Sequence, residues 1–181
     1  NHQGILARVD MFAYYTVNDI LITAKERKEN PFIVLLDGIV DPHNLGAIIR
    51  TADCAGVHGI VIPKNRSAGL NATVAKLSAG AIKYVKVARV TNLTETIRQL
   101  KKLGLWIIGC DTQTSLDYRS MEAKSSIGIV IGSEGKGISR LVKENCDFVV
   151  KLPMKGNITS LNASVAAGIV LYEALNQRCP L

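Results

Sequence analysis

Short apolar runs recur along the chain, and stretches with a helical spacing of apolar residues lie between most of them. Apolar residues three or four positions apart indicate helices around residues 45–52, 93–100 and 165–172, whereas the runs have the length of buried strands. Strands that alternate with helices are typical of an α/β fold, which we predict to be a mostly parallel six-stranded sheet with helices on both faces. The predicted strands span residues 32–36, 59–62, 84–88, 105–109, 127–131 and 148–152.

The first 31 residues follow another pattern. Tyr14 and Tyr15 precede a polar amphipathic stretch, residues 18–30, which ends before Pro31. We therefore predict a linker and an accessory helix in residues 1–31, and one α/β domain in residues 32–181.

The last predicted helix presents a surface of small residues. Small side chains let another backbone approach closely, so this surface is either part of the core or a seam between two copies of the chain. We predict a homodimer that uses this surface. Its members are Ala163, Ala166, Ala167 and Gly168.

Composition narrows the class of protein. Of the 181 residues, 48% are hydrophobic and 20% are charged, which is ordinary for a globular protein and excludes disordered, collagen-like and coiled-coil chains. Aromatic residues make up only 5%, which disfavours a platform for stacking bases. No apolar run approaches the roughly 18 residues that span a bilayer, and Arg8 and Asp10 interrupt the first apolar stretch, so we predict neither a membrane span nor a signal peptide.

The cysteines and histidines lack the spacing of a metal site. No two cysteines form a CxxC pair, and no histidine is paired with them, so we predict no metal and free thiols in a reducing cytoplasm. The residues concerned are Cys54, Cys110, Cys146, Cys179, His2, His43 and His58.

Positive charge is concentrated in one segment. The chain has 22 Lys and Arg against 15 Asp and Glu, a net charge of +7. Residues 64–102 hold nine basic residues and one acid, Glu95, so this segment alone carries +8. Such a stripe on a nearly neutral body is typical of a nucleic-acid binder, although charge alone fits a set of solvated helix faces equally well.

Three polar segments each begin where a predicted strand ends, which is where open α/β sheets bind ligands. The first, residues 37–50 (DGIVDPHNLGAIIR), contains Asn44 and Arg50. Asn44 has the place of a helix N-cap, and the residues alone favour that role over a functional one. Arg50 stands among residues of buried type, where a guanidinium needs an anion or a carboxylate.

The second segment, residues 131–140 (IGSEGKGISR), is a glycine-rich loop that lets backbone amides approach a ligand. Its glycine order matches neither the dinucleotide fingerprint nor the phosphate-binding loop. Glu134 would repel a phosphate, so a ligand with positive charge or a hydroxyl suits the loop better. An ordinary turn before a helix is the alternative.

The third segment, residues 151–164 (KLPMKGNITSLNAS), places Ser160, Asn162 and Ser164 at the start of the last helix. One of the three suffices for capping. The surplus polar groups indicate that this helix end meets a ligand.

Together the three segments resemble the motifs of the SpoU-type ribose 2′-O-methyltransferases of the SPOUT superfamily. They read DPHNLGAIIRTADCAGV, IGIVIGSEGKGISRLV and LPMKGNITSLNASVAAGIVLYEA, and the resemblance covers about residues 32–181. It is strongest to the branch that methylates guanosines of ribosomal RNA. Residues 1–4 also resemble the junction that follows a small RNA-binding domain in such enzymes, which implies such a domain upstream.

The resemblance implies the SPOUT fold with a C-terminal trefoil knot, S-adenosylmethionine as cofactor, and a homodimer whose active site draws on both protomers. The family binds its cofactor mostly through backbone, at positions that match Gly109, Cys110, Gly132, Leu152 and Leu161 here. Family active-site positions match Asn44, Arg50, Glu134, Ser160 and Asn162. Lys83 departs from the Glu of many relatives, which leaves the catalytic positions intact and bears on RNA or interface contacts.

By this resemblance the protein methylates a ribose 2′-hydroxyl in RNA, with a guanosine of large-subunit ribosomal RNA as the favoured target and no metal. Arg50 would position the target phosphate and the 2′-hydroxyl, although its high pKa makes it a poor general base. Glu134 and Asn162 would orient Arg50 and the loop, while Asn44 and Ser160 would hold RNA or the helix ends.

Three alternatives differ in substrate or in class. Transfer RNA could be the methylated RNA. A catalytically silent RNA-binding module would keep the basic stripe but has no need for the site residues as a set. A nucleotide-dependent oxidoreductase fits an α/β fold but requires the dinucleotide fingerprint that this chain lacks.

Overall fold

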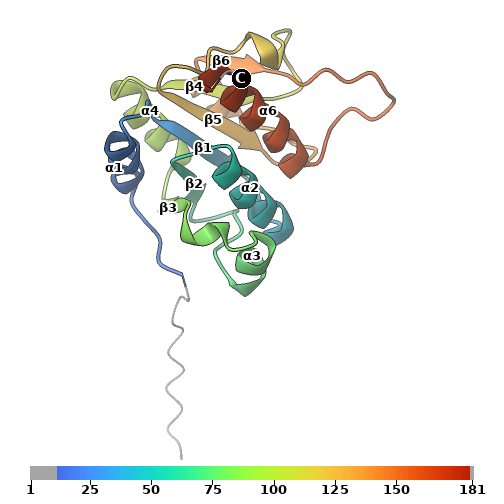
Figure 1. Cartoon of the computed structure of the whole chain (residues 1–181). Helices are drawn as coiled ribbons and strands as arrows, with labels where there is room; N and C mark the ends of the chain where they lie inside the picture. Colours follow the sequence, from blue (N-terminus) through green and yellow to red (C-terminus); the bar gives the residue numbers. More distant parts are fainter. Residues whose placement is uncertain (1–11, 180–181) are drawn as a thin grey trace, which may run out of the picture.

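The computed structural model describes residues 12–179 and contains a six-stranded sheet in which every neighbouring pair of strands is parallel (Figure 1). The strand order is β3-β2-β1-β5-β4-β6. The predicted parallel α/β sheet is thereby confirmed. The strands are β1 (Phe32–Asp37), β2 (Gly59–Pro63), β3 (Lys86–Val90), β4 (Trp106–Cys110), β5 (Ile127–Gly132) and β6 (Phe148–Val150).

Helices cover both faces of the sheet, because each face of a parallel sheet must be buried. One core cluster lies between the sheet and α2, α3 and α6, and a second lies between the sheet and α1, α4 and α5. In Figure 1, α2 and α6 lie side by side across one face. Across residues 12–179, no helix combines the length and the apolar character that crossing a membrane requires. The helices are α1 (Val17–Arg27), α2 (Pro42–Cys54), α3 (Ala72–Leu77), α4 (Leu93–Lys102), α5 (Arg140–Asn145) and α6 (Ala163–Arg178), with 3-10 turns at Ala81–Lys83 and Tyr118–Ser120.

The central pair of strands brings two polar segments together. β1 and β5 are buried along nearly their whole length, as their continuous apolar runs predict. Their register aligns Asp37 with Gly132, so both strands end at the same level. The segment that follows Asp37 and the glycine-rich loop that follows Gly132 therefore leave the sheet next to each other.

Two predicted strands have ends that differ by two residues from those in the structure, while the other ends agree within one residue. β3 was expected at residues 84–88, but the N–H of Tyr84 donates to the carbonyl of Ala81 at 2.9 Å and closes a 3-10 turn. The strand therefore starts two residues later, and the Tyr84 side chain is 70% exposed. β6 ends at Val150 because Lys151 forms an isolated bridge with Asp117 instead.

The helix expected in residues 18–30 is α1. Thr16 caps it and forms a capping box with Asp19, and Ile20 is buried against the sheet. Tyr15, just before the helix, forms a parallel bridge with Ala88 on β3. The division into a linker and a separate domain stays a prediction, and residues 1–11 lie outside the described part of the chain.

The small-residue surface of α6 is core. Ala163 and Ala167 are buried in the core cluster between the sheet and α2, α3 and α6, so the predicted homodimer seam at these residues is wrong. An apolar stripe at i, i+4 and i+7 is exposed instead. It consists of Val165, Ile169 and Tyr172, with 49%, 37% and 51% of their surfaces exposed.

The basic segment, residues 64–102, is divided between two places, so the prediction of a single stripe is wrong. On α4, Arg98 donates to Asn145 at 3.0 Å, and Lys101 pairs with Asp147 at 2.7 Å. The charge of Lys101 is therefore neutralised by Asp147, and the Arg98 guanidinium is engaged by Asn145, the last residue of α5. Among the cations before α4, Lys83, Lys86 and Arg89 lie in or just before β3, the edge strand of the sheet.

Candidate active site

A pocket lies at the carboxyl ends of β4 and β5. Its walls come from the segments 110–112, 131–137, 152–154 and 160–166, which bring together parts of the second and third polar segments. The space measures about 600 Å³ including its opening to solvent. We call it the β4–β5 pocket.

The glycine-rich loop forms one wall of this pocket. Ser133 and Gly137 exchange backbone hydrogen bonds at 2.9 and 3.1 Å, so residues 134–136 form a tight turn. A Cβ on Gly132 would lie 2.2 Å from the carbonyl carbon of Gly137 and 2.4 Å from the nitrogen of Ile138. Only glycine at position 132 lets the loop fold back this closely.

Asn162 connects three segments beside the pocket. Its Nδ2 donates to Oδ1 of Asn44 at 2.9 Å and to Oε2 of Glu134 at 3.3 Å. Its Oδ1 accepts from the backbone N–H of Ser164 at 3.0 Å and from that residue's hydroxyl at 2.6 Å. Asn162 is the N-cap of α6, and its amide nitrogen remains free to join Asn44 to Glu134. These three residues are the Asn44–Glu134–Asn162 cluster.

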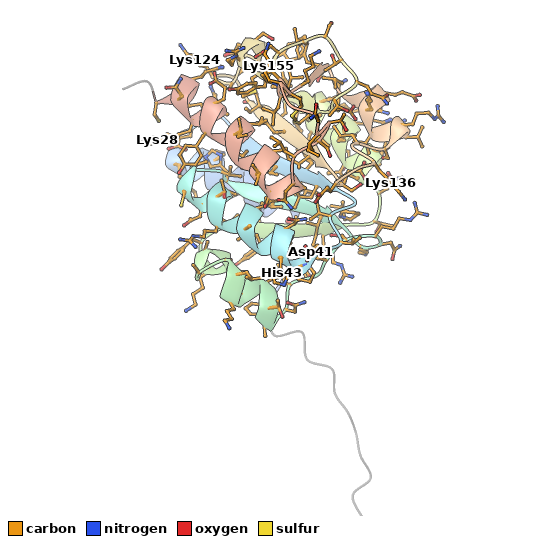
Figure 2. All side chains as sticks on the ribbon, turned by 90° about the vertical axis from the view of Figure 1, so that its right-hand side faces the viewer. Lys28, Asp41, His43, Lys124, Lys136 and Lys155 are labelled. Carbon is orange, nitrogen blue, oxygen red and sulfur yellow. The ribbon has the colours of Figure 1, made fainter. Side chains whose placement is uncertain are left out.

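Asn44 is not an N-cap, contrary to the reading that the residues alone favoured. Asp41 caps α2 by accepting from the N–H of His43 at 2.9 Å, and Pro42 occupies the first helical position, where its missing N–H costs nothing. Asn44 therefore stands inside the first turn, with its side chain free to reach Asn162. Figure 2 shows Asp41 and His43 at this end of α2, toward the same side as Lys136 of the glycine-rich loop and away from Lys28.

Asp111 is a pocket residue that the sequence analysis missed. Its carboxylate accepts from the N–H of Gln113 at 2.8 Å, from Lys143 Nζ at 3.1 Å and from the N–H of Ile138 at 3.3 Å. Burial alone would raise the pKa of Asp111, but these hydrogen bonds outweigh it and hold the pKa below its usual value. The ionised carboxylate thus anchors the end of the glycine-rich loop. Its position two residues after a predicted strand was the available signal.

Cys110 faces the same pocket as a neutral thiol. Burial, followed by the charge of Asp111, raises its pKa to about 11. A thiol with this pKa carries almost no thiolate at neutral pH, so Cys110 is a packing group and not a nucleophile.

Four of the five predicted cofactor positions line the pocket: Cys110, Gly132, Leu152 and Leu161. The fifth, Gly109, lies within β4 and is directed elsewhere, since a Cβ there would meet Ile138 at 2.9 Å. Its task in this structure is close packing beneath the loop.

The predicted catalytic residues are only partly brought together. Glu134 and Ser160 line the pocket, while Asn162 bonds to Glu134 from beside it and Asn44 accepts from Asn162. Arg50 lies further along α2 with an exposed side chain, and no ion pair joins it to any residue within 12–179. Water therefore solvates its guanidinium in the single chain, and the expectation that an anion or a carboxylate accompanies Arg50 stays a prediction.

The pocket combines apolar walls with two carboxylates. Ile131, Leu152 and Met154 supply apolar surface, and Asp111 and Glu134 supply negative charge. Such a pocket suits a ligand with a flat apolar part and a positive charge. Within the described chain, no three His, Cys, Asp or Glu side chains lie close enough together to hold a metal ion.

Comparisons with known proteins agree with this arrangement. The family model of the SpoU rRNA methylase family matches residues 31–172. The Bacillus subtilis protein YacO, whose name places it in the TrmH family of tRNA/rRNA methyltransferases, is 53% identical over 180 residues, which are 99% of this chain and 72% of that protein. A Staphylococcus aureus protein named for the same family is 50% identical over 98% of this chain and 71% of its own length.

Solved structures show the same architecture. The SpoU methyltransferase AviRb from Streptomyces viridochromogenes in complex with AdoMet superposes with a TM-score of 0.76 and 30% identity, over 83% of this chain and 61% of that chain. The TrmH/SpoU tRNA modifying enzyme of A. aeolicus has a TM-score of 0.76 and 30% identity, over 87% of this chain and 84% of that chain.

The matched range covers both central strands, the β4–β5 pocket and the whole Asn44–Glu134–Asn162 cluster. It therefore includes the residues on which the resemblance first rested. The chain belongs to the SpoU family of RNA methyltransferases.

Proposed function

We propose that this protein transfers a methyl group from S-adenosylmethionine to a ribose 2′-hydroxyl of RNA, with a guanosine of large-subunit ribosomal RNA as the favoured target. The observation that carries the proposal is the Asn44–Glu134–Asn162 cluster at the edge of the β4–β5 pocket. It joins all three polar segments of the sequence in one place. The trefoil knot implied by the family resemblance is part of the same proposal.

The pocket fits S-adenosylmethionine. A Cβ at Gly132 would meet the backbone of Gly137, and Leu152 and Leu161 add apolar side chains to the lining of the same pocket, which together suit an adenine ring. The carboxylates of Asp111 and Glu134 complement a cofactor that carries a sulfonium and an ammonium group. When bound there, the cofactor supplies an activated methyl group.

The chain's own contribution is positioning. A hydroxyl must lie in line with the methyl group at roughly 3–3.5 Å, and holding it there supplies much of the acceleration. Asn162 donates a hydrogen bond to Glu134 and so fixes this pocket residue in place, and the Ser160 hydroxyl in the pocket lining is available to RNA. We assign Arg50 to the RNA phosphate, where its planar fork can hold two oxygens together.

A second copy of the chain would bring Arg50 to the site. Arg50 makes no ion pair within its own described fold, and the exposed stripe of Val165, Ile169 and Tyr172 lies on α6, the helix packed beside α2. We propose that two copies associate through this stripe, so that Arg50 of one copy serves the pocket of the other. Light scattering at micromolar concentration should give twice 19.5 kDa, and Ile169→Arg should give the monomer.

Methyl transfer to unmodified RNA tests the function. Ribosomal RNA transcripts and a transfer RNA pool would be incubated with radiolabelled S-adenosylmethionine, and the modified nucleotide located by its resistance to alkaline cleavage. We expect 2′-O-methylation of a guanosine in the large-subunit transcript. Label in transfer RNA alone would move the assignment to transfer RNA, and cofactor binding without label in either RNA would favour the silent RNA-binding module.

A further inference from the structure

Three of the five tyrosines gather at the β3 edge of the sheet, although aromatic residues are scarce in the chain. Tyr15 pairs with β3 through its backbone, Tyr14 lies beside it, and Tyr84 stands just before the strand. Figure 1 shows the segment that leads into α1 running past β3. Tyr84 is 70% exposed and Tyr15 is 44% exposed.

Cations lie among these rings. The ammonium of Lys86 is 5.5 Å from the centroid of Tyr15, and the guanidinium of Arg89 is 5.2 Å from the centroid of Tyr14. Each cation is held over a ring face, the geometry of a cation–π contact. Lys83 is exposed beside Tyr84.

The same contacts hold a basic loop, residues 64–71, in place. Tyr14 accepts from the N–H of Leu70 at 2.8 Å through its hydroxyl, and Arg89 donates to the carbonyl of Lys64 at 3.1 Å. Arg66 stays in the left-handed region, at a φ of 56°, which a side-chain-bearing residue adopts only where its surroundings hold it. Lys64 and Arg66 are exposed at this loop.

The loop connects this edge with the candidate active site. The N–H of Ala68 donates to the carbonyl of Ile39 at 2.7 Å, in the segment between β1 and α2. That segment leads directly to Asn44 of the Asn44–Glu134–Asn162 cluster. A continuous path therefore runs from the cluster, over residues 64–71, to the rings at β3.

We propose that this path, from Lys64 and Arg66 to Lys83 and Tyr84, binds a single-stranded segment of RNA next to the methylated nucleotide. It rests on the proposed function for its substrate. Exposed cations fit phosphates, and an exposed tyrosine ring stacks on an unpaired base, which a duplex does not offer. Arg98 and Lys101 of α4 are excluded from the path, because both are paired beside α5.

Fluorescence anisotropy tests the path with a labelled 20-nucleotide single-stranded RNA of mixed sequence and with the same sequence as a duplex. The double variant Lys64→Glu with Lys83→Glu should weaken single-strand binding at least tenfold. The dependence of log affinity on log salt should become less steep, by about 0.7 per lost phosphate contact. The matched control reverses two exposed lysines off the path, Lys102→Glu with Lys124→Glu, and should stay within about threefold of wild type. Equal losses in the two double variants would overturn the proposal.

A second comparison isolates stacking from charge. Tyr84→Ala should weaken single-strand binding on the order of fivefold, whereas Tyr84→Phe keeps the ring and should bind within twofold of wild type. Equal binding by all three proteins, or equal affinity of the wild type for strand and duplex, would overturn the assignment to a single strand. Calorimetry with S-adenosylmethionine is run on every variant. If the wild type binds no cofactor, the proposed function is contradicted. If the wild type is active but the variants on the path bind RNA as well as it does, only the proposed RNA path is contradicted.

Discussion

Asn162 donates from Nδ2 to Oδ1 of Asn44 over 2.9 Å and so ties the N-cap of α6 to the first turn of α2. The two ends of this one side chain have different tasks. Oδ1 accepts from the N–H of Ser164 and stabilises the helix end, while Nδ2 reaches Asn44 and Glu134. Substitutions can separate the two tasks.

Asn162→Asp should retain the fold and lose activity. An aspartate caps a helix as well as asparagine does, so its free energy of unfolding should stay within about 0.5 kcal/mol of wild type. It cannot donate to Asn44, and it places a second carboxylate beside Glu134. Methyl transfer should fall at least about tenfold.

Asn162→Ala is the matched variant, because it loses both tasks. It should lose similar activity and in addition about 1 kcal/mol of stability. Urea unfolding and single-turnover methyl transfer supply the two readouts. Wild-type turnover in the aspartate variant would show that Asn162 serves only as a cap.

Much of the fold follows from the apolar pattern alone. The runs that form β1 and β5 are continuous because both faces of each strand are covered, and the helical spacing around residues 45–52 and 93–100 marks the buried faces of α2 and α4. The residue at which α2 begins was harder to predict from the sequence. Both Asp41 and Asn44 are good caps, and the choice between them depends on Pro42, which suits the first helical position.

Charge and partner surfaces could not be predicted from spacing. Lys101 and Lys64 belong to one basic segment, yet only the three-dimensional fold brings Asp147 to the former. Similarly, tertiary packing decides which side of α6 is buried, since the helix has both a small-residue side at Ala167 and an apolar side at Ile169. Asp111 was not predicted as a pocket residue, because a single acidic residue after a strand matches no recognised motif.

Arg50→Ala should leave cofactor affinity and stability nearly unchanged, because the side chain is exposed and does not line the β4–β5 pocket. Turnover on RNA should fall at least about tenfold, which corresponds to about 1.4 kcal/mol of barrier. Arg50→Lys should fail almost as badly, since an ammonium keeps the charge and loses the planar fork.

Single-turnover methyl transfer at saturating RNA and cofactor is the measurement for Arg50, because saturation removes binding from the comparison. A wild-type rate in Arg50→Ala would place the reaction centre elsewhere, with Glu134 and Asn162 as the next candidates.

His58 provides a prediction for pH. Its side chain is buried, Nδ1 accepts from the N–H of Phe32 at 2.9 Å, and Nε2 lies 2.9 Å from Oε2 of Glu29. Because Nδ1 accepts, the proton of the neutral ring is on Nε2 and donates to the carboxylate. Burial lowers the pKa of His58 below its usual value, although Glu29 partly opposes this shift.

The folded protein therefore resists protonation of His58 more than the unfolded chain does. The resulting stability is fully present above about pH 6.5, the ordinary pKa of the unfolded histidine, and decreases as the pH falls toward the lower folded pKa. Urea unfolding between pH 5 and 8 should show this decrease in wild type. In His58→Asn, whose amide oxygen can still accept from Phe32, the decrease should be smaller, and equal pH profiles would contradict the assignment.

Among the glycines that line the pocket, Gly132 leaves the least room for an added Cβ. Its missing Cβ leaves room for the backbone of Gly137 and Ile138, which a methyl group would meet at 2.2 to 2.4 Å. The neighbouring atoms are backbone and cannot turn aside as a flexible side chain would. An added methyl must therefore move the loop that carries Glu134 and forms one wall of the β4–β5 pocket.

Gly132→Ala should accordingly weaken S-adenosylmethionine binding at least about tenfold in calorimetry and cost about 1–3 kcal/mol of stability, the usual range for an overpacked site. Gly156→Ala is the matched control, because a Cβ at Gly156 has open space around it and the backbone there lies outside the left-handed region. It should bind cofactor and unfold like wild type. Thermal unfolding without cofactor establishes that Gly132→Ala is still folded at the temperature of the titration, so that a loss of binding reports on the loop. Cofactor affinity in Gly132→Ala equal to that of Gly156→Ala would show that the loop can move without affecting the site, and the cofactor would then have to be assigned to another surface of the chain.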